Sequence, residues 1–279
     1  NDTITAGTGD DTITAGAGDD TITAGAGDDT ITAALGDDTV IVGIGDDIIN
    51  GGDDIDTLDF SNINGDIEVD LSKTTIQDTK TAGNDTISNF ENVIGSVFND
   101  TIAGSAMVDN IIDGNTGSDT VSYSYATSGV KVSLDENGSG FGYKGIATDT
   151  LKNIENITGS THNDTLEGNK YVNTLKGGDG DDSFINSAGD DTIEGGDGSD
   201  TLDYSLASSV INVDIATSGD GTVTVDSNKD TIKDIENIIG TDGSDVIVSN
   251  DTSNIANTFR GGDGSDTLDG GSGDDTLHG

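Results

Sequence analysis

The 279-residue sequence contains no cysteine, no proline and no tryptophan, and aromatic residues make up only 4% of it. Aromatic and large aliphatic side chains are too few to fill a thick core. Without cysteine, and with only His162 and His278 far apart in the chain, the usual zinc and copper ligands are missing. No apolar run approaches the roughly 18 residues that a membrane-spanning helix needs.

Basic residues are also scarce, with 10 Lys and Arg against 54 Asp and Glu and a formal net charge of −44. A chain without a basic face does not bind nucleic acid, and an anionic membrane surface is disfavoured for the same reason. Such acidity is typical of a disordered chain, a halophile surface or a metal-binding polymer. A folded chain requires cations that neutralise the carboxylates.

What is present is a nine-residue repeat. An aspartate recurs every nine residues over the first 56, and an aliphatic residue follows each aspartate by two positions. The aliphatic positions are Ile4, Ile13, Ile22, Ile31, Val40, Ile49 and Leu58. A glycine stands two residues before the aspartate at Gly9, Gly18, Gly27, Gly36 and Gly45.

The period of nine predicts a solenoid. Six residues rich in Gly and Asp form a turn, because Gly adopts backbone angles that other residues resist. Three residues such as Thr12 to Thr14 form a short strand with the middle residue inward. Two units complete a coil, so residues 18 apart stack about 4.8 Å from one another. Asp11 then stacks on Asp29, and Asp20 on Asp38 on the other side.

Stacked carboxylates repel one another unless a cation lies between them. Calcium suits this position because it prefers oxygen and takes six to eight ligands, including backbone carbonyls, which glycine-rich turns expose. On the order of 10 to 20 calcium ions are expected for the whole chain.

The repeat unit resembles the calcium-binding nonapeptide of the RTX (repeats-in-toxin) family, Gly-Gly-x-Gly-x-Asp-x-U-x with U aliphatic. The fullest matches begin at Gly177, Gly195 and Gly261, whereas Asp54 replaces the fourth-position glycine in the copy that begins at Gly51. The resemblance implies an all-β, right-handed parallel β-roll or β-helix solenoid with calcium in both rows of turns. It also implies that the sixth-position Asp and turn carbonyls are the ligands, and that Ala at the first position is harmless.

After residue 56 the repeat lengthens into modules of 63, 63 and 66 residues. The phrase Asp-Thr-aliphatic recurs at Asp56, Asp119 and Asp200, and its aromatic partners Phe60, Tyr123 and Tyr204 are predicted to pack inside wider coils. The predicted division is residues 1–56 (nonapeptide roll), 57–119, 120–182 (extended modules), 183–200 (nonapeptides), 201–266 (third module) and 267–279 (further repeats).

The candidate calcium ligands are the aspartates that share this phase. They are Asp2, Asp11, Asp20, Asp29, Asp38, Asp47, Asp56, Asp85, Asp100, Asp119, Asp149, Asp164, Asp182, Asp191, Asp200, Asp230, Asp245, Asp266 and Asp275. A second recurring carboxylate is the glutamate of the Ile/Phe-Glu-Asn phrase. It is read as a solvated or turn-capping group, with an additional calcium ligand as the alternative, at Glu91, Glu155 and Glu236.

We expect no enzyme, because neither histidine lies near a nucleophile motif. The RTX resemblance implies export through a type I channel, folding in extracellular calcium, and a structural role at the cell surface as an adhesin stalk, surface layer or filament. Two alternatives stay open: the C-terminal calcium-binding region of a type I-secreted hydrolase or toxin, and a carbohydrate- or ice-binding module that uses the Thr rows. The chain begins and ends inside a repeat, so we expect a piece of a longer array whose ends or sides stack on other copies.

Overall fold

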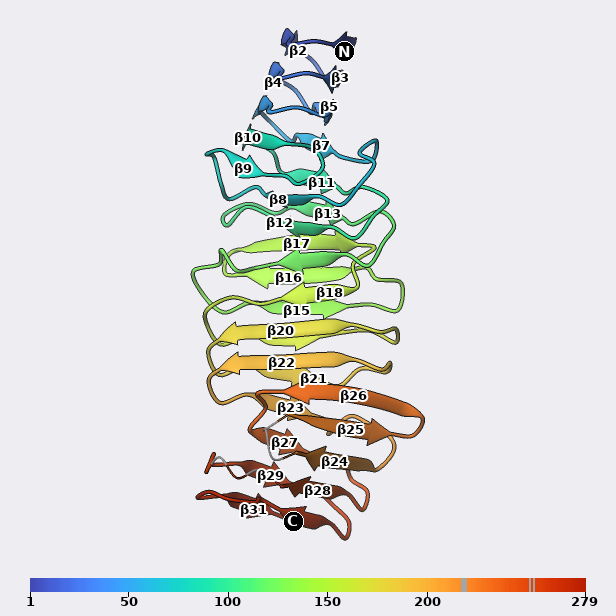
Figure 1. Ribbon diagram of the computed structural model, residues 1–279, viewed down its shortest axis with the longest axis vertical. Coiled ribbons are helices and arrows are strands. Elements are labelled where there is room, and N and C mark those ends of the chain that lie inside the picture. The colour runs from blue at the N-terminus through green and yellow to red at the C-terminus, as the bar shows by residue number, and fades with distance from the viewer. Residues whose placement is uncertain (217–219, 251, 253) are drawn as a thin grey trace. The chain divides into compact units, whose positions relative to one another are not determined.

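A computed structural model describes residues 1–216, 220–250, 252 and 254–279. The chain divides into two compact units, Asn1–Tyr125 with Gly138–Ile154, and Ala126–Asn137 with Glu155–Gly279. In both units the described residues form short β-strands joined by turns (Figure 1).

The first unit contains sixteen strands among its described residues. They are β1 (Thr3–Thr8), β2 (Thr12–Ala17), β3 (Thr21–Ala26), β4 (Thr30–Leu35), β5 (Thr39–Ile41), β6 (Ile48–Asp53), β7 (Thr57–Asp59), β8 (Glu68–Asp70), β9 (Gln77–Asp78), β10 (Asn84–Ser88), β11 (Asn92–Ile94), β12 (Thr101–Ala103), β13 (Ile111–Asp113), β14 (Thr120–Ser122), β16 (Gly140–Lys144) and β17 (Ala147–Lys152).

These strands form parallel ladders with the predicted spacing. One ladder runs β1-β3-β5-β7-β11-β13-β17, a second runs β2-β4-β6-β10, and a third runs β8-β12-β14. Ile22 pairs with Val40 and Val40 with Leu58, so residues 18 apart stack as expected. All three side chains are completely buried, and each contributes roughly 1.5–3 kcal/mol of hydrophobic stabilisation.

The strands of the nonapeptide region are longer than predicted. Three-residue strands occur at β5 and β7, but β1 to β4 and β6 each contain six residues. The ladder continues into the turn because Gly16 pairs with Ala34, and a glycine there tolerates the positive φ of 121°. The three-residue prediction was wrong for β1 to β4 and β6, since the turn backbone also finds partners in the next coil.

The second unit contains fifteen strands among its described residues. They are β15 (Lys131–Leu134), β18 (Asn156–Thr158), β19 (Thr165–Glu167), β20 (Thr174–Asp179), β21 (Ser183–Ile185), β22 (Thr192–Asp197), β23 (Thr201–Asp203), β24 (Ile211–Ile215), β25 (Gly221–Val225), β26 (Asn228–Lys233), β27 (Asn237–Ile239), β28 (Val246–Ser249), β29 (Thr258–Arg260), β30 (Thr267–Asp269) and β31 (Thr276–His278).

The second unit repeats the same construction. Its parallel ladders run β15-β19-β21-β23-β27-β29-β31, β18-β20-β22-β26 and β24-β28-β30. Phe184 lies between Leu166 and Leu202 in the first of them, and all three are completely buried. The predicted all-β parallel solenoid is confirmed.

The long modules differ from the nonapeptide region by antiparallel hairpins. In the first unit β9 pairs with β10 and β16 pairs with β17, and in the second unit β24, β25 and β26 form an antiparallel meander. The inserted residues fold back into the sheet, where their backbone groups find partners. The wider coils predicted from the sequence therefore contain antiparallel hairpins, which the repeat pattern did not indicate.

The wider coils place their aromatic residues as predicted. Phe60, Tyr123 and Tyr204 are completely buried. The module boundaries stay a prediction, and the third module includes residues 217–219, 251 and 253, which lie outside the described part of the chain. Among the residues that the structure describes, no helix is long and apolar enough to cross a bilayer.

Candidate metal site in the turns

The phased aspartates form continuous carboxylate rows. In each row the Oδ1 atom of one aspartate accepts the amide N–H of the residue at the same position one coil earlier. The amide of Asp20 donates to Asp38 at 2.7 Å, and the amide of Asp38 donates to Asp56 at 2.8 Å. A parallel row contains Asp29 and Asp47, joined at 2.8 Å. The sequence-derived stacking of these carboxylates is therefore seen in the structure.

The second carboxylate oxygen is left without a donor in many turns. Each such Oδ2 atom is buried and has no hydrogen-bond partner among the described residues, at Asp20, Asp29, Asp38, Asp47, Asp56, Asp149, Asp182 and Asp200. Burial raises the pKa of Asp182 to about 7 and that of Asp47 to about 6. An ionised carboxylate in this position needs a positive partner, because burying an unpaired charge costs several kcal/mol.

Backbone carbonyls face the same small spaces. A Cβ atom built on Gly177 would lie 2.0 Å from Asp182 Oδ2 and 2.6 Å from the carbonyl oxygen of Gly195 in the next coil. A Cβ on Gly195 would lie 2.4 Å from Asp200 Oδ2 and 2.0 Å from the carbonyl oxygen of Asp234. Carboxylate and carbonyl oxygens thus meet at the first glycine of the turn, with no donor between them.

This donor set fits calcium. No group of three or more His, Cys, Asp or Glu side chains gathers around one point in the described residues. An ion in these turns would therefore combine one or two carboxylates with backbone carbonyls, which are ligands that calcium accepts and that zinc does not favour. Further towards the N-terminus, Ala24, Ala33 and Val42 occupy the first position of the turn and are buried. That Ala is harmless there stays a prediction.

A second class of turn supplies its own donors. Ser96 stands four residues before Asp100, donates its amide N–H to Oδ2 at 2.6 Å and donates its hydroxyl to Oδ1 at 2.8 Å. The same capping occurs between Ser160 and Asp164. Thr241 likewise caps Asp245, where its amide donates to Oδ2 at 2.6 Å. In the uncapped turns of Asp182 and Asp200 that fourth preceding residue is glycine, which offers no hydroxyl.

Three more candidate ligands receive a side-chain hydroxyl. Thr79 donates to Asp85, Ser187 donates to Asp191 at 3.0 Å, and the buried hydroxyl of Tyr204 donates to Asp230 at 2.6 Å. Burial, followed by the charge of Asp230, raises the pKa of Tyr204 well above its usual value. These carboxylates depend less on an external cation than the uncapped ones.

The recurring glutamates extend the rows. Glu91 Oε2 accepts the amide N–H of Asp56 at 2.8 Å, and Glu236 Oε2 accepts that of Asp200 at 2.9 Å. Each glutamate therefore takes the place of the next aspartate in its row. This favours the turn-capping reading and keeps both glutamates as candidate ligands beside uncapped aspartates.

Three asparagines were missed as members of the rows. Each is buried and donates its side-chain amide to the backbone carbonyl of the preceding recurring glutamate. The distances are 2.8 Å from Asn110 to Glu91, 2.7 Å from Asn173 to Glu155 and 3.2 Å from Asn257 to Glu236. At the glutamate the coil presents a carbonyl to its neighbour, so a donor is required. The signal was available, because an Asn follows each glutamate by 18 to 21 residues.

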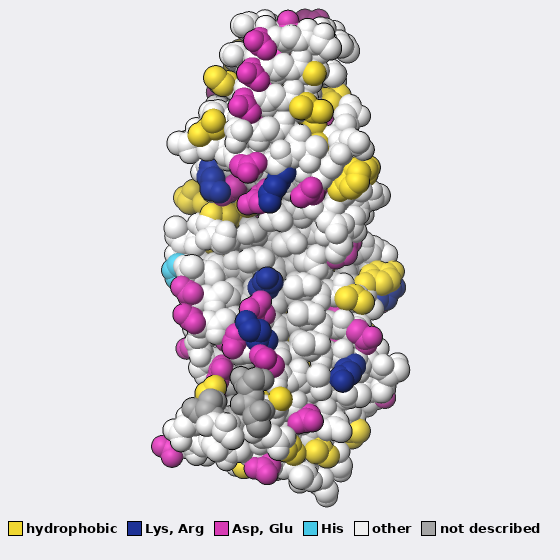
Figure 2. Space-filling model, in the orientation of Figure 1, with side chains coloured by type: hydrophobic (Ala, Val, Ile, Leu, Met, Phe, Trp, Pro, Cys, Tyr) yellow, Lys and Arg dark blue, Asp and Glu magenta, His cyan; other side chains and the backbone are white. Residues whose placement is uncertain are grey.

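The fifth-position aspartates form a separate, exposed set. Asp28 accepts the amide N–H of Asp46 at 2.9 Å, and Asp46 accepts that of Asn84 at 2.9 Å. They therefore cap the turn of the following coil. Figure 2 shows acidic side chains following one another along the surface at the N-terminal end.

The remaining predicted residues also lie in rows. The amide of Asp2 donates to Asp20, that of Asp11 to Asp29, that of Asp100 to Asp119, that of Asp245 to Asp266 and that of Asn257 to Asp275. Asp54, at the non-glycine position, adopts a φ of 84°, so its turn is kept and Asp56 remains in line. The structure brings all the predicted aspartates into such rows, but their ligation of calcium stays a prediction.

The rows of turns define a calcium-binding repeat domain. The family model of the RTX calcium-binding nonapeptide repeat matches residues 1–31, 23–58, 158–186, 187–206 and 251–279, which together are just under half of the chain. The chain therefore carries repeats of the RTX calcium-binding family, whose nonapeptides bind calcium ions at multiple sites. RTX repeats are structural, generally non-catalytic, and typical of secreted proteins. No curated protein matches the chain.

Proposed function

We propose that this chain is a calcium-binding structural domain that folds when calcium binds outside the cell and forms a rigid cell-surface or extracellular element. The aspartates with unpartnered Oδ2 atoms, apart from Asp149, whose Oδ1 atom contacts Lys144, are the proposed principal ligands, with turn carbonyls completing the coordination. The observation that carries this proposal is the burial of these oxygens in register, coil after coil. Calcium binding then contributes the free energy that folds the chain, since the unfolded chain has no preformed site.

The proposal also accounts for the charge of −44. At low calcium, mutual repulsion keeps the chain expanded, which suits export as an unfolded chain through a type I channel. Where calcium is abundant, ions between successive turns neutralise the rows, and the aliphatic ladder of Ile22, Val40 and Leu58 closes. An adhesin stalk, a surface layer and a filament all require such a stiff repeat, and lateral or end-to-end contact with other copies is part of the same proposal.

A calcium titration of the full chain tests this proposal. Far-ultraviolet circular dichroism should change cooperatively from an unfolded spectrum in chelator to a β-rich spectrum at millimolar calcium. Native mass spectrometry should then count several bound ions per chain, whereas magnesium at the same concentration should bind far fewer because it demands a tighter octahedral shell. A β-rich spectrum that persists in chelator, or no ions bound at millimolar calcium, would contradict the proposal.

One observation favours a second function, a carbohydrate- or ice-binding surface. Thr3, Thr21, Thr39 and Thr57 stand in register on successive strands, so their side chains form a ladder. Threonine is also a good strand former, which explains the ladder without a ligand. Ice-recrystallisation and glycan-binding assays on the calcium-loaded chain, with Thr21→Lys and Thr39→Lys as variants, decide whether the ladder binds a ligand or only stabilises the strands.

A further inference from the structure

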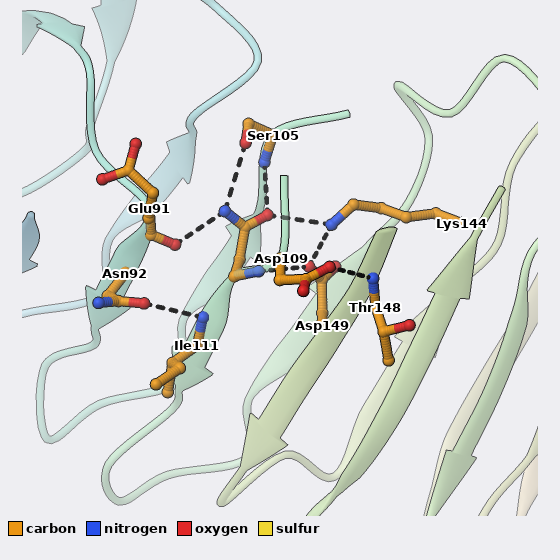
Figure 3. A network of polar contacts seen from close by, with 9 residues as sticks. Glu91, Asn92, Ser105, Asp109, Ile111, Lys144, Thr148 and Asp149 are labelled. Atoms are coloured by element: carbon orange, nitrogen blue, oxygen red, sulfur yellow. Dashed lines mark hydrogen bonds and ion pairs between the residues drawn. The ribbon is translucent and has the colours of Figure 1, made fainter. Parts of the chain in front are cut away.

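Lys144 is a buried lysine at the end of β16, in the hairpin of the second module. Only 5% of the residue is exposed. Its Nζ atom donates to Asn110 Oδ1 at 3.1 Å and also contacts Asp149 Oδ1 (Figure 3). Every other charged contact of a lysine described in the structure involves a side chain that is about half exposed.

The ammonium group lies between two successive coils of one row. Asn110 precedes β13 and Asp149 lies in β17, and these strands are parallel neighbours. The amide of Asn110 donates to Asp149 Oδ1 at 3.0 Å, which is the same contact that joins uncapped aspartates elsewhere. Asn110 Oδ1 also accepts the amide of Ser105 at 2.9 Å. Nζ therefore occupies the point where side-chain oxygens of adjacent turns converge.

We call each such pair of stacked side chains from neighbouring coils a rung; among the described residues of the second unit, the two related rungs contain no such cation. Asn173 and Asp191 are joined in the same way at 2.9 Å, and there the hydroxyl of Ser187 reaches the aspartate. In the rung of Asn257, the buried Oδ1 atom has no hydrogen-bond partner among the described residues. Lys144 therefore fills a space that one related rung leaves without any donor.

The other modules also lack an equivalent of Lys144. Five residues before the corresponding aspartate stand Val225 in the third module and Lys80 in the first. Lys80 is exposed and pairs with Glu68 at 3.2 Å, so it does not enter a row.

We propose that Lys144 is a built-in cation that takes the place of a calcium ion between Asn110 and Asp149, so that this rung needs no metal. The inference rests on the proposed calcium-dependent fold of the other rows. An ammonium group supplies a positive charge and three N–H donors, and the chain itself tethers it, so its occupancy is independent of calcium concentration. A calcium ion reaching either oxygen of Asp149 would lie close to Nζ, and the two charges would repel.

The experiment compares the calcium-loaded wild-type chain with the variant Lys144→Met/Asn110→Asp. The variant removes the ammonium group and restores the aspartate of the repeat. Crystals of both chains, with terbium in place of calcium, give anomalous peaks that locate each ion, and native mass spectrometry with calcium counts them. Lys170→Met is the matched control, because Lys170 is exposed and pairs with Glu136 at 3.2 Å.

We expect no peak between Asn110 and Asp149 in the wild-type chain, one new peak there in the double variant, and one more calcium ion per chain. The control should keep the wild-type count. A wild-type peak at this rung with Lys144 displaced would overturn the inference, and so would a double variant that fails to fold in calcium or gains no ion. A wild-type chain without ions in any turn would refute the proposed function and this inference together. A wild-type chain that binds ions in the other turns and also between Asn110 and Asp149 would refute only the inference.

Discussion

The two classes of turn make a sharp prediction about calcium stoichiometry. Asp182 has an unpartnered Oδ2, whereas Asp245 is capped by Thr241. Both are buried members of rows in the second unit, and each accepts an amide N–H from the previous coil, at 2.7 and 2.8 Å. Replacing each with asparagine removes the same charge from comparable surroundings, so the difference between the variants reports on the ion.

In Asp182→Asn we expect one calcium ion fewer per chain. The asparagine can keep its Oδ1 toward the amide of Asp164 and place its NH2 group near the carbonyl of Gly195. The main loss is therefore the stabilisation that one bound ion adds to the free energy of unfolding, about 2.7 kcal/mol when calcium is 100-fold above its dissociation constant. This loss grows by about 1.4 kcal/mol for each tenfold rise in calcium.

In Asp245→Asn we expect an unchanged ion count. The carboxylate of Asp245 accepts from the amide and hydroxyl of Thr241 and from the amide of Ile211, and the substitution removes one of its two acceptor oxygens. This loss costs about 1–3 kcal/mol of unfolding free energy at every calcium concentration. Native mass spectrometry gives the counts, and urea unfolding at two calcium concentrations above the folding midpoint gives the free energies. If Asp182→Asn kept all its ions, or Asp245→Asn lost one, the division of the turns into two classes would be wrong.

Three further predictions concern pH, the turn glycines and the core. Without ions, burial raises the pKa of Asp182 from 3.8 to about 7, so the stability contributed by its protonated form is present below pH 3.8 and is lost as pH rises through about 7. Calcium binds the ionised form, so the calcium concentration at the folding midpoint should decrease as the pH is raised from about 5 to about 8. A constant midpoint in dichroism titrations would contradict this. Gly196→Ala should cost clearly more unfolding free energy than Gly7→Ala, because both have positive φ but only the new Cβ at Gly196 would meet a carbonyl oxygen, at 2.0 Å; equal costs in urea unfolding would speak against that contact. Phe184→Ala should lose about 3–5 kcal/mol, whereas Phe141→Ala, whose side chain is half exposed, should lose far less in the same assay.

Much of the fold followed from spacing alone. The period of nine placed Ile22, Val40 and Leu58 in one stack and Asp20 and Asp38 in another, because a coil of 18 residues brings equal positions together. The nonapeptide motif also indicated calcium. The hairpin of β16 and β17 could not be predicted in this way, because it interrupts the repeat. The neighbours of its strands are set by the fold of the whole coil.

The sequence by itself determined that aspartates stack in rows and that these rows require positive charge, because periodicity and charge are local properties of the chain. Only the tertiary structure decided which carboxylates are left with an unpartnered oxygen. Ser96 caps Asp100 through the path of the turn, and Tyr204 and Lys144 reach Asp230 and Asp149 from positions 26 and 5 residues away. A donor such as Tyr204 is brought to its carboxylate by the packing of whole coils, so the repeat pattern alone does not reveal it.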